Sequence, residues 1–140
     1  MKGESMTKYS RQREAILAYL RSTKSHPTAI AVYNEVRKEF PNISLGTVYR
    51  NLSMLTESNT ILRLDCGQGR EHYDATTETH YHFCCRNCGN VSDLNIPVIF
   101  DGGSLTAYGF HGTVESHSVM FFGLCEHCEE QTVRSETAAS

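Results

Sequence analysis

The chain has 140 residues, 39% of them hydrophobic, and no apolar run approaches the ~18 residues of a membrane-spanning helix, so no membrane partner is expected. The net charge of −3 hides an asymmetry: residues 1–73 carry 11 Lys and Arg against 7 Asp and Glu, whereas residues 74–140 carry 2 against 9. A basic half and an acidic half predict two modules with different partners, and the basic one favours nucleic acid.

Three helices are predicted in the first half, each preceded by a residue that caps helices well. They are Arg11–Leu20 after Ser10, a helix through Val32, Tyr33, Val36 and Phe40 between Thr28 and Pro41, and Leu45–Glu57 after Ser44. Two strands then follow, Thr60–Cys66 and Arg70–Tyr73, with a turn at Gly67-Gln68-Gly69. Three helices and a hairpin, in that order, predict a winged helix-turn-helix DNA-binding domain over residues 1–74.

The third helix of such a domain enters the major groove of DNA and leads with its N-terminal residues. We expect Val48, Leu52 and Leu55 on its buried side, and Thr47, Tyr49, Arg50 and Ser53 on its exposed side. Arg50 would then reach a phosphate or a guanine edge, and Tyr49 a phosphate or a thymine methyl. The pattern alone leaves open a small helical bundle in which Tyr49 and Arg50 are only solvated.

The second half predicts a small α/β module over residues 75–140, which makes the whole chain α+β. Its expected strands are His82–Cys85, Val91–Leu94 and the β-rich run Val114–Leu124. Between them, Pro97–Tyr108 has room for a short helix that Gly102-Gly103 weakens. The polar tail Thr132–Ser140 is expected to be disordered.

Two CxxC motifs, Cys85–Cys88 and Cys125–Cys128, lie 36 residues apart in this half. Together they offer four thiolates, the ligand set of a closed tetrahedral zinc site. Two disulfides or a redox-active pair are the alternatives. The first 25 residues are charged and resemble no signal peptide, so we expect a cytoplasmic chain, in which disulfides are rare. The motifs therefore predict a structural Zn²⁺.

Imidazoles and carboxylates gather near the junction of the two halves. His80 and His82 are two residues apart, so on a strand they share one face, and Asp74 and Asp93 lie on either side of them. His26 lies in a loop of the basic half. Such ligands suit Fe²⁺, Mn²⁺ or Zn²⁺. Any one of these histidines, taken alone, is as well explained as an ordinary surface or capping residue.

Three segments carry a family resemblance: SHPTAIAVYNEVRKEFPNISLGTVYRNL, HYDATTETHYHFCCRNCG and FFGLCEHC. Over roughly residues 8–130 the chain resembles the ferric uptake regulator superfamily, with these motifs in the same order and spacing. The resemblance implies a homodimeric repressor that binds double-stranded operator DNA, with a winged helix followed by a dimerisation domain. It also implies that Cys85, Cys88, Cys125 and Cys128 hold structural zinc, and that a regulatory Fe²⁺ or Mn²⁺ binds five residues: His26, Asp74, His80, His82 and Asp93.

Two positions are similar to the peroxide-sensing branch of that superfamily. Residue 74 is Asp where iron-uptake regulators typically have Glu, and the histidine stretch is HYH where iron sensors often have HHDH. The residues of an accessory metal site are thereby replaced by Thr79 and Tyr81, which leaves His117 without partners. In this branch the resemblance implies that Fe²⁺ reacts with peroxide and that His26 or His80 is oxidised.

Two other functions remain open at this stage. One is an iron, zinc or manganese uptake regulator with the same fold and no peroxide chemistry. The other is an enzyme, either a metal-dependent hydrolase or a CxxC oxidoreductase. A hydrolase needs a placed general base, and the sequence offers none beside the ligands. We therefore expect no enzyme.

Overall fold

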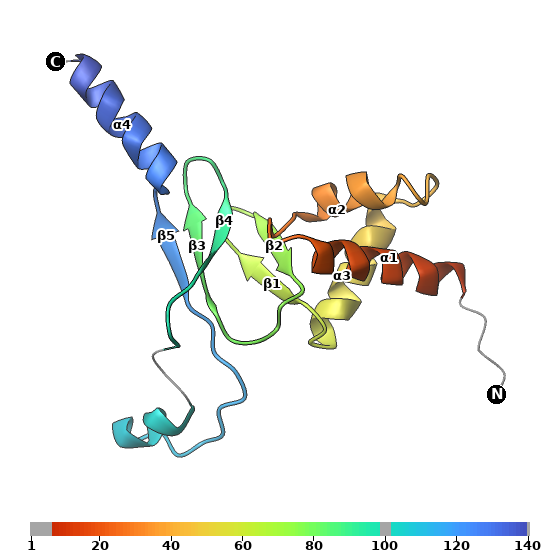
Figure 1. Ribbon diagram of the computed structural model, residues 1–140. Coiled ribbons are helices and arrows are strands. Elements are labelled where there is room, and N and C mark those ends of the chain that lie inside the picture. The colour runs from red at the N-terminus through yellow and green to blue at the C-terminus, as the bar shows by residue number, and fades with distance from the viewer. Residues whose placement is uncertain (1–6, 99–101, 140) are drawn as a thin grey trace. The chain divides into compact units, whose positions relative to one another are not determined.

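The computed structural model of the chain describes residues 7–98 and 102–139. The chain divides into two compact units, Met1–Thr77 and Glu78–Ser140, which are called the helical unit and the sheet unit below. The fold is α+β, as the sequence predicts (Figure 1). Within the described ranges, no helix is long and apolar enough to cross a membrane.

The helical unit holds three helices and one hairpin, in the predicted order. These elements are α1 (Lys8–Ser22), α2 (Ala29–Val36), α3 (Leu45–Glu57), β1 (Leu62–Asp65) and β2 (Glu71–Asp74). The two strands pair antiparallel, and Gly67 and Gly69, with φ of 81° and 73°, supply the left-handed conformations that their tight turn requires. The helices and the hairpin form one winged helix-turn-helix architecture.

Helix caps in this unit follow the predictions at two of three positions. Side-chain oxygens of Thr28 and Ser44 accept the backbone N–H groups of Ala31 and Thr47, at 3.2 and 3.0 Å. The prediction for the first helix was wrong, because Thr7 caps it by accepting the N–H of Ser10. Ser10 therefore lies inside α1, since Thr7 offers the same hydroxyl group one turn earlier.

Helix α2 also ends earlier than predicted, at Val36 instead of near Phe40. The N–H groups of Lys38 and Glu39 donate to carbonyls three residues back, which is the geometry of a tightening final turn. Pro41 disfavours the helical conformation at the residue before it, so the chain leaves the helix ahead of Phe40.

A single apolar core holds the helical unit together. The three predicted residues of α3 are all buried, and they pack with apolar residues of α1, α2 and the hairpin. The core consists of Ile16, Leu17, Leu20, Ala29, Val32, Val36, Ile43, Val48, Leu52, Leu55, Ile61 and Tyr73. Because this core takes up one side of α3, the opposite side of the helix is left for solvent or a partner.

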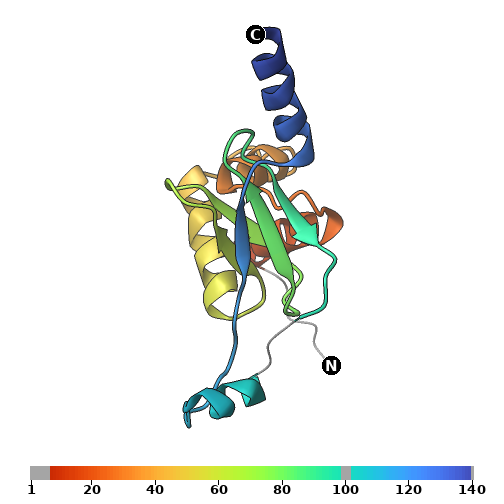
Figure 2. The ribbon, with the colours of Figure 1, turned by 90° about the vertical axis from the view of Figure 1, so that its left-hand side faces the viewer.

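The sheet unit is built on three strands in the order β4-β3-β5 (Figure 2). The central strand, β3 (Tyr81–Cys85), pairs antiparallel with β4 (Val91–Leu94) and parallel with β5 (Met120–Gly123). A 3-10 helix, η1 (Gly102–Tyr108), lies on the long connection between β4 and β5. The predicted run Val114–Leu124 is thus a strand only in its last part, where it pairs with β3.

The prediction of a disordered tail was wrong. Residues Glu126–Ala139 form the helix α4, and Ser140, the last residue of the predicted tail, lies outside the described residues. Two acidic residues in the first turn suit the positive end of the helix dipole. Hydroxyls of Thr132 and Ser135 donate to carbonyls four residues back, so these polar side chains are accommodated within the helix.

Candidate metal centres and nucleic-acid face

Four cysteines converge where β3 ends and α4 begins. Cys85 closes β3, Cys88 lies on the following turn, Cys125 precedes α4 and Cys128 is in its first turn. Their sulfur atoms all lie within 4.8 Å of one another, and those of Cys88 and Cys125 are 3.8 Å apart. A zinc tetrahedron with Zn–S bonds of ~2.3 Å has edges of about 3.8 Å. The cluster therefore has the size of a zinc site.

The electrostatics of the cluster also favour a bound cation. Backbone N–H groups of Cys125 and Cys88 stabilise the thiolate of Cys85 and lower its pKa to about 5. The pKa of Cys88 is instead raised to about 11, because desolvation and the three neighbouring sulfurs outweigh the N–H of Asn90, which lowers it. Four thiolates at this spacing repel one another unless a cation neutralises them. Zn²⁺, which binds deprotonated cysteine, fits these donors.

A second ligand set lies in the sheet unit, around Asp93. His82 faces Asp93 across the β3–β4 pairing, and His80 precedes β3. Nε2 of His80 and Nε2 of His82 lie 3.1 and 3.2 Å from the same Oδ1 of Asp93. The two ring centroids are 4.2 Å apart. The structure thus brings three of the five predicted regulatory ligands together, with His80 one residue before the start of β3.

A hydrogen bond determines which nitrogen of the His80 ring carries the proton. Nδ1 of His80 lies 2.6 Å from the carbonyl oxygen of Glu78. A carbonyl only accepts, so Nδ1 carries the proton and, in the neutral ring, Nε2 keeps its lone pair. Metal-binding histidines are commonly oriented in this way by a partner on the second nitrogen.

The helical unit brings together the other two predicted ligands. Nδ1 of His26 lies 3.5 Å from Oδ2 of Asp74, and both side chains are buried. His26 has a φ of 50°, a left-handed conformation that is uncommon for a residue with a side chain. His72 donates from Nδ1 to the carbonyl of His26 at 2.7 Å, and the N–H of Tyr73 donates to Pro27 at 3.0 Å. Strand β2 therefore holds the His26 loop in this conformation.

Sequence reasoning gave His72 no separate role. The residue is buried and its ring supports the backbone of a predicted ligand 46 positions away. No spacing in the sequence connects the two positions, so only the fold shows the contact.

The predicted DNA-reading residues share the exposed side of α3. Tyr49 and Arg50 are exposed, and Thr47 is half-buried beside them. Oγ1 of Thr47 accepts from Nη2 of Arg50 at 2.9 Å and lies 2.9 Å from Oγ of the capping residue Ser44. These contacts hold the first turn of α3 and the Arg50 guanidinium in a defined arrangement.

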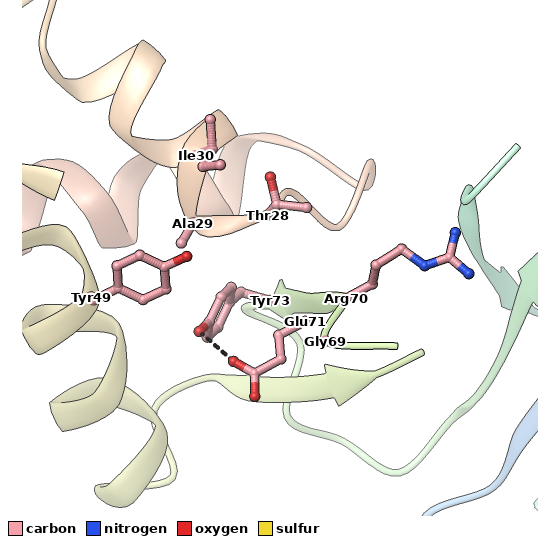
Figure 3. A pocket seen from close by; sticks show the side chains of 8 residues that line it. All are labelled: Thr28, Ala29, Ile30, Tyr49, Gly69, Arg70, Glu71 and Tyr73. Carbon is pink, nitrogen blue, oxygen red and sulfur yellow. Dashed lines mark hydrogen bonds between the residues drawn. The ribbon is translucent and has the colours of Figure 1, made fainter. Parts of the chain in front are cut away.

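Tyr49 also borders a cavity of about 240 Å³ between α2, α3 and the hairpin (Figure 3). Its ring faces the cavity together with that of Tyr73, whose hydroxyl donates to Oε2 of Glu71 at 3.4 Å. Burial, followed by the charge of Glu71, raises the pKa of Tyr73, so this phenol stays protonated. The cavity lies beside the exposed face of α3, so Tyr49 is part of a shaped surface that includes the hairpin.

Tyr81 occupies a buried position in the sheet unit and lies edge-on to His117, with ring centroids 6.5 Å apart. Nε2 of His117 is buried and has no hydrogen-bond partner among the residues that the structure describes. The aromatic ring beside His117 is thus that of Tyr81, one of the two residues that replace the accessory-site ligands of iron sensors.

A winged helix-turn-helix followed by a metal-binding sheet unit defines a class of metal-dependent transcriptional regulator. Comparison with known proteins agrees: the model of the ferric uptake regulator family matches residues 4–122. The peroxide operon regulator of Bacillus subtilis is 34% identical over 128 residues, which is 91% of this chain and 88% of that protein.

Solved structures show the same relationship. The peroxide stress regulator of Campylobacter jejuni has a TM-score of 0.68 and 32% identity, covering 86% of this chain and 91% of that one. The ferric uptake regulator of Helicobacter pylori, described with three functional metal-binding sites, has a TM-score of 0.72 and 26% identity, covering 86% and 81%. The chain belongs to the ferric uptake regulator family. Members of this family are DNA-binding transcriptional regulators, so the chain is not an enzyme.

Proposed function

We propose that the chain is a repressor that needs a regulatory metal ion to bind its operator, and that peroxide inactivates it by oxidising a ligand histidine. The observation that carries the proposal is the pair of ligand sets, His26 with Asp74 and His80 with His82 and Asp93. The similarity to peroxide regulators of Bacillus subtilis, Staphylococcus epidermidis and Campylobacter jejuni supports the peroxide part.

The ligand sets explain how a metal could control DNA binding. Two ligands from the helical unit are too few for a tight site, and three from the sheet unit leave positions open. We propose that one Fe²⁺ or Mn²⁺ ion takes ligands from both sets, which suits the preference of these ions for imidazole and carboxylate. An ion bound in this way restricts the two units relative to each other. Metal affinity and DNA affinity are then linked reciprocally.

The peroxide response follows from the chemistry of the ligands. Bound Fe²⁺ would supply the electrons that break the O–O bond of peroxide. One oxygen atom is then inserted into a C–H bond of a ligand imidazole, and the other leaves as water. We propose His26 and His80 as the targets. An oxidised ring binds metal poorly, so the ligand set is lost and the operator is released.

The remaining assignments concern the two units and their partners. We propose that residues 1–74 bind double-stranded operator DNA and that residues 75–140 form a homodimer, in a protein that works in the cytoplasm. Strand β5 is an edge strand whose Phe121 and Phe122 are 42% and 60% exposed. Large apolar side chains on an open strand edge are typical of a surface that a partner covers.

Peroxide treatment of the metal-loaded protein tests this function. We expect the Fe²⁺-loaded protein to gain one oxygen atom on His26 or His80 and to lose DNA affinity. The Mn²⁺-loaded protein should keep its mass and its affinity, because Mn²⁺ does not readily reduce peroxide in such a site. Tandem mass spectrometry locates the added oxygen, and a DNA-binding assay on the same samples reports the repressor.

The exposed residues His111 and His127 serve as internal controls, since neither belongs to a ligand set. Equal oxidation of these residues and of His26 and His80 would show diffuse damage and contradict a built sensor. An Fe²⁺-loaded protein that binds DNA and resists oxidation would instead be a metal-uptake regulator.

The DNA-binding face of α3 gives a separate prediction. Replacing Arg50 with alanine should weaken binding to a duplex selected by the parent protein by roughly 1–3 kcal/mol. The reason is that Arg50 is exposed on the same helix side as Tyr49 and is oriented by Thr47. Fluorescence anisotropy measures the change, and metal content should stay the same.

Arg21→Ala is the matched control, because Arg21 is an exposed arginine in the last turn of α1. If the Arg50→Ala and Arg21→Ala proteins both bind the duplex as the parent does, α3 is not the recognition helix.

A further inference from the structure

The side chain of Arg13, on α1, contacts the side of α3 that carries proposed DNA-reading residues. Nε of Arg13 donates to Oδ1 of Asn51 at 3.2 Å, and Nη2 lies 3.8 Å from the sulfur of Met54. Thr47, Arg50, Asn51 and Met54 occupy positions i, i+3, i+4 and i+7, so they form one row along the helix. Arg13 therefore lies against the row that contains the proposed DNA-reading residues.

The outer edge of this guanidinium makes no strong hydrogen bond within the described residues. Nη1 has no acceptor among the described residues, and a thioether sulfur is only a weak acceptor for Nη2. Neither Arg13 nor Arg50 has an acidic partner in the described part of the chain, although both contact the Thr47–Asn51 turn of α3. Two unneutralised guanidinium groups on one turn favour an anionic partner.

Asn51 has the properties of a residue that orients others. It is buried, its Oδ1 accepts from Arg13, and its Nδ2 donates to the carbonyl of Thr47 at 3.0 Å. Thr47 in turn accepts from Arg50. One hydrogen-bonded network thus connects the two arginines, one from α1 and one from α3.

We propose that Arg13 is a second DNA-binding arginine, which Asn51 positions through Nε so that both Nη groups face the nucleic acid. This inference rests on the proposed function of α3. The ligand is a pair of acceptors matched to the planar fork, either two phosphate oxygens or O6 and N7 of a guanine. The sequence pattern did not single out Arg13, because it lies on the first helix and not on the recognition helix.

The test uses the full-length, Mn²⁺-loaded protein and two duplexes, one selected from a random library by the parent protein and one with a scrambled sequence. Arg13→Ala should weaken binding to the selected duplex roughly 5- to 150-fold. If Arg13 binds phosphate, affinity falls for both duplexes and the salt slope falls by about 1. If it binds guanine, the selected duplex alone is affected and one base position loses its preference. Arg11→Ala, an exposed arginine on the same helix, is the control and should bind selected DNA better than Arg13→Ala.

Asn51→Asp tests the positioning role, because it keeps an acceptor for Nε of Arg13 while the donor to Thr47 is lost. Arg13 should then still contribute to binding, so adding Arg13→Ala to Asn51→Asp should weaken binding further. In Asn51→Ala, which removes the acceptor, adding Arg13→Ala should cost much less than it does in the parent. If Arg13→Ala weakens DNA binding equally in the parent and in Asn51→Ala, Asn51 does not position Arg13.

Two results would overturn the inference. One is parent-like binding by Arg13→Ala, and the other is a loss of affinity that follows thermal stability while the salt slope and base preferences are unchanged. The outcomes separate this inference from the proposal beneath it. If Arg50→Ala weakens binding and Arg13→Ala does not, only the inference about Arg13 fails. If Arg50→Ala has no effect, the role of α3 fails first.

Discussion

Replacing Cys85 with serine is expected to unfold the sheet unit and to remove its zinc. Structural zinc contributes folding free energy on the order of 10 kcal/mol, more than a small domain can lose. Cys85 is buried at the end of the central strand β3, so its loss affects both the metal and the strand. Elemental analysis should find about one zinc per chain in the parent and far less in the variant, and circular dichroism should show lost helix.

The helical signal comes largely from α4. Of the α4 side chains that the structure describes, Cys128 alone is buried, and helices of this length are marginal in water without packing. The cysteine cluster is therefore the main anchor of α4, and the helix should melt when the zinc is lost.

Asn87→Ser is the matched control in the same turn. It removes the hydrogen bond from Nδ2 of Asn87 to the sulfur of Cys128 and keeps all four ligands. We expect a cost of only about 1 kcal/mol and full zinc content. A Cys85→Ser protein that retains α4 and a cooperative unfolding transition without zinc would contradict a structural role for the metal.

Replacing Asp93 with alanine should have the largest effect on the proposed regulatory site. Nε2 of His80 and Nε2 of His82 both lie close to the same oxygen of this carboxylate. The variant therefore loses the residue at the centre of the ligand set. Changes outside the ligand shell already cost about 10–100-fold in metal affinity, and a lost ligand should cost at least as much. Mn²⁺ binding measured by competition with a chelator should fall accordingly, and DNA binding should be lost at Mn²⁺ concentrations that saturate the parent.

Glu115→Ala provides the comparison, because Glu115 is an exposed acid of the same unit outside the ligand set. Zinc content should be unchanged in both variants, which separates this effect from unfolding. Parent-like Mn²⁺ affinity in Asp93→Ala would show that the His80–His82–Asp93 cluster is not the regulatory site.

Local signals predicted the elements that depend on local interactions. Helix α3 begins and ends where its cap and its apolar repeat indicate, and the four cysteines meet as their spacing suggests. The tail was misjudged because its composition is polar, and composition does not reveal that the first turn of α4 contributes to the four-cysteine cluster. Strand β5 was predicted too long because β-rich residues form a strand only where a neighbour, here β3, offers backbone partners.

The candidate sites show the same division. Ligand types could be predicted from residue chemistry, since histidine and aspartate at short spacing are typical of a metal site. The residues that hold these groups in place, His72 behind His26 and Asn51 behind Arg13, could not be predicted. Each acts across a long sequence separation, and each is an ordinary polar residue until the fold supplies its partner.

The left-handed backbone at His26 has an evolutionary consequence. In the proposed function, residue 26 has to supply an imidazole and also to tolerate a positive φ. Residues that adopt this conformation readily, such as glycine or asparagine, offer no equivalent ligand. Most other residues would strain the loop ahead of Pro27 and disturb the carbonyl that His72 holds. If the proposed metal sensing were lost, glycine and asparagine would be the replacements that keep this backbone conformation, so sequence change at position 26 should run toward them.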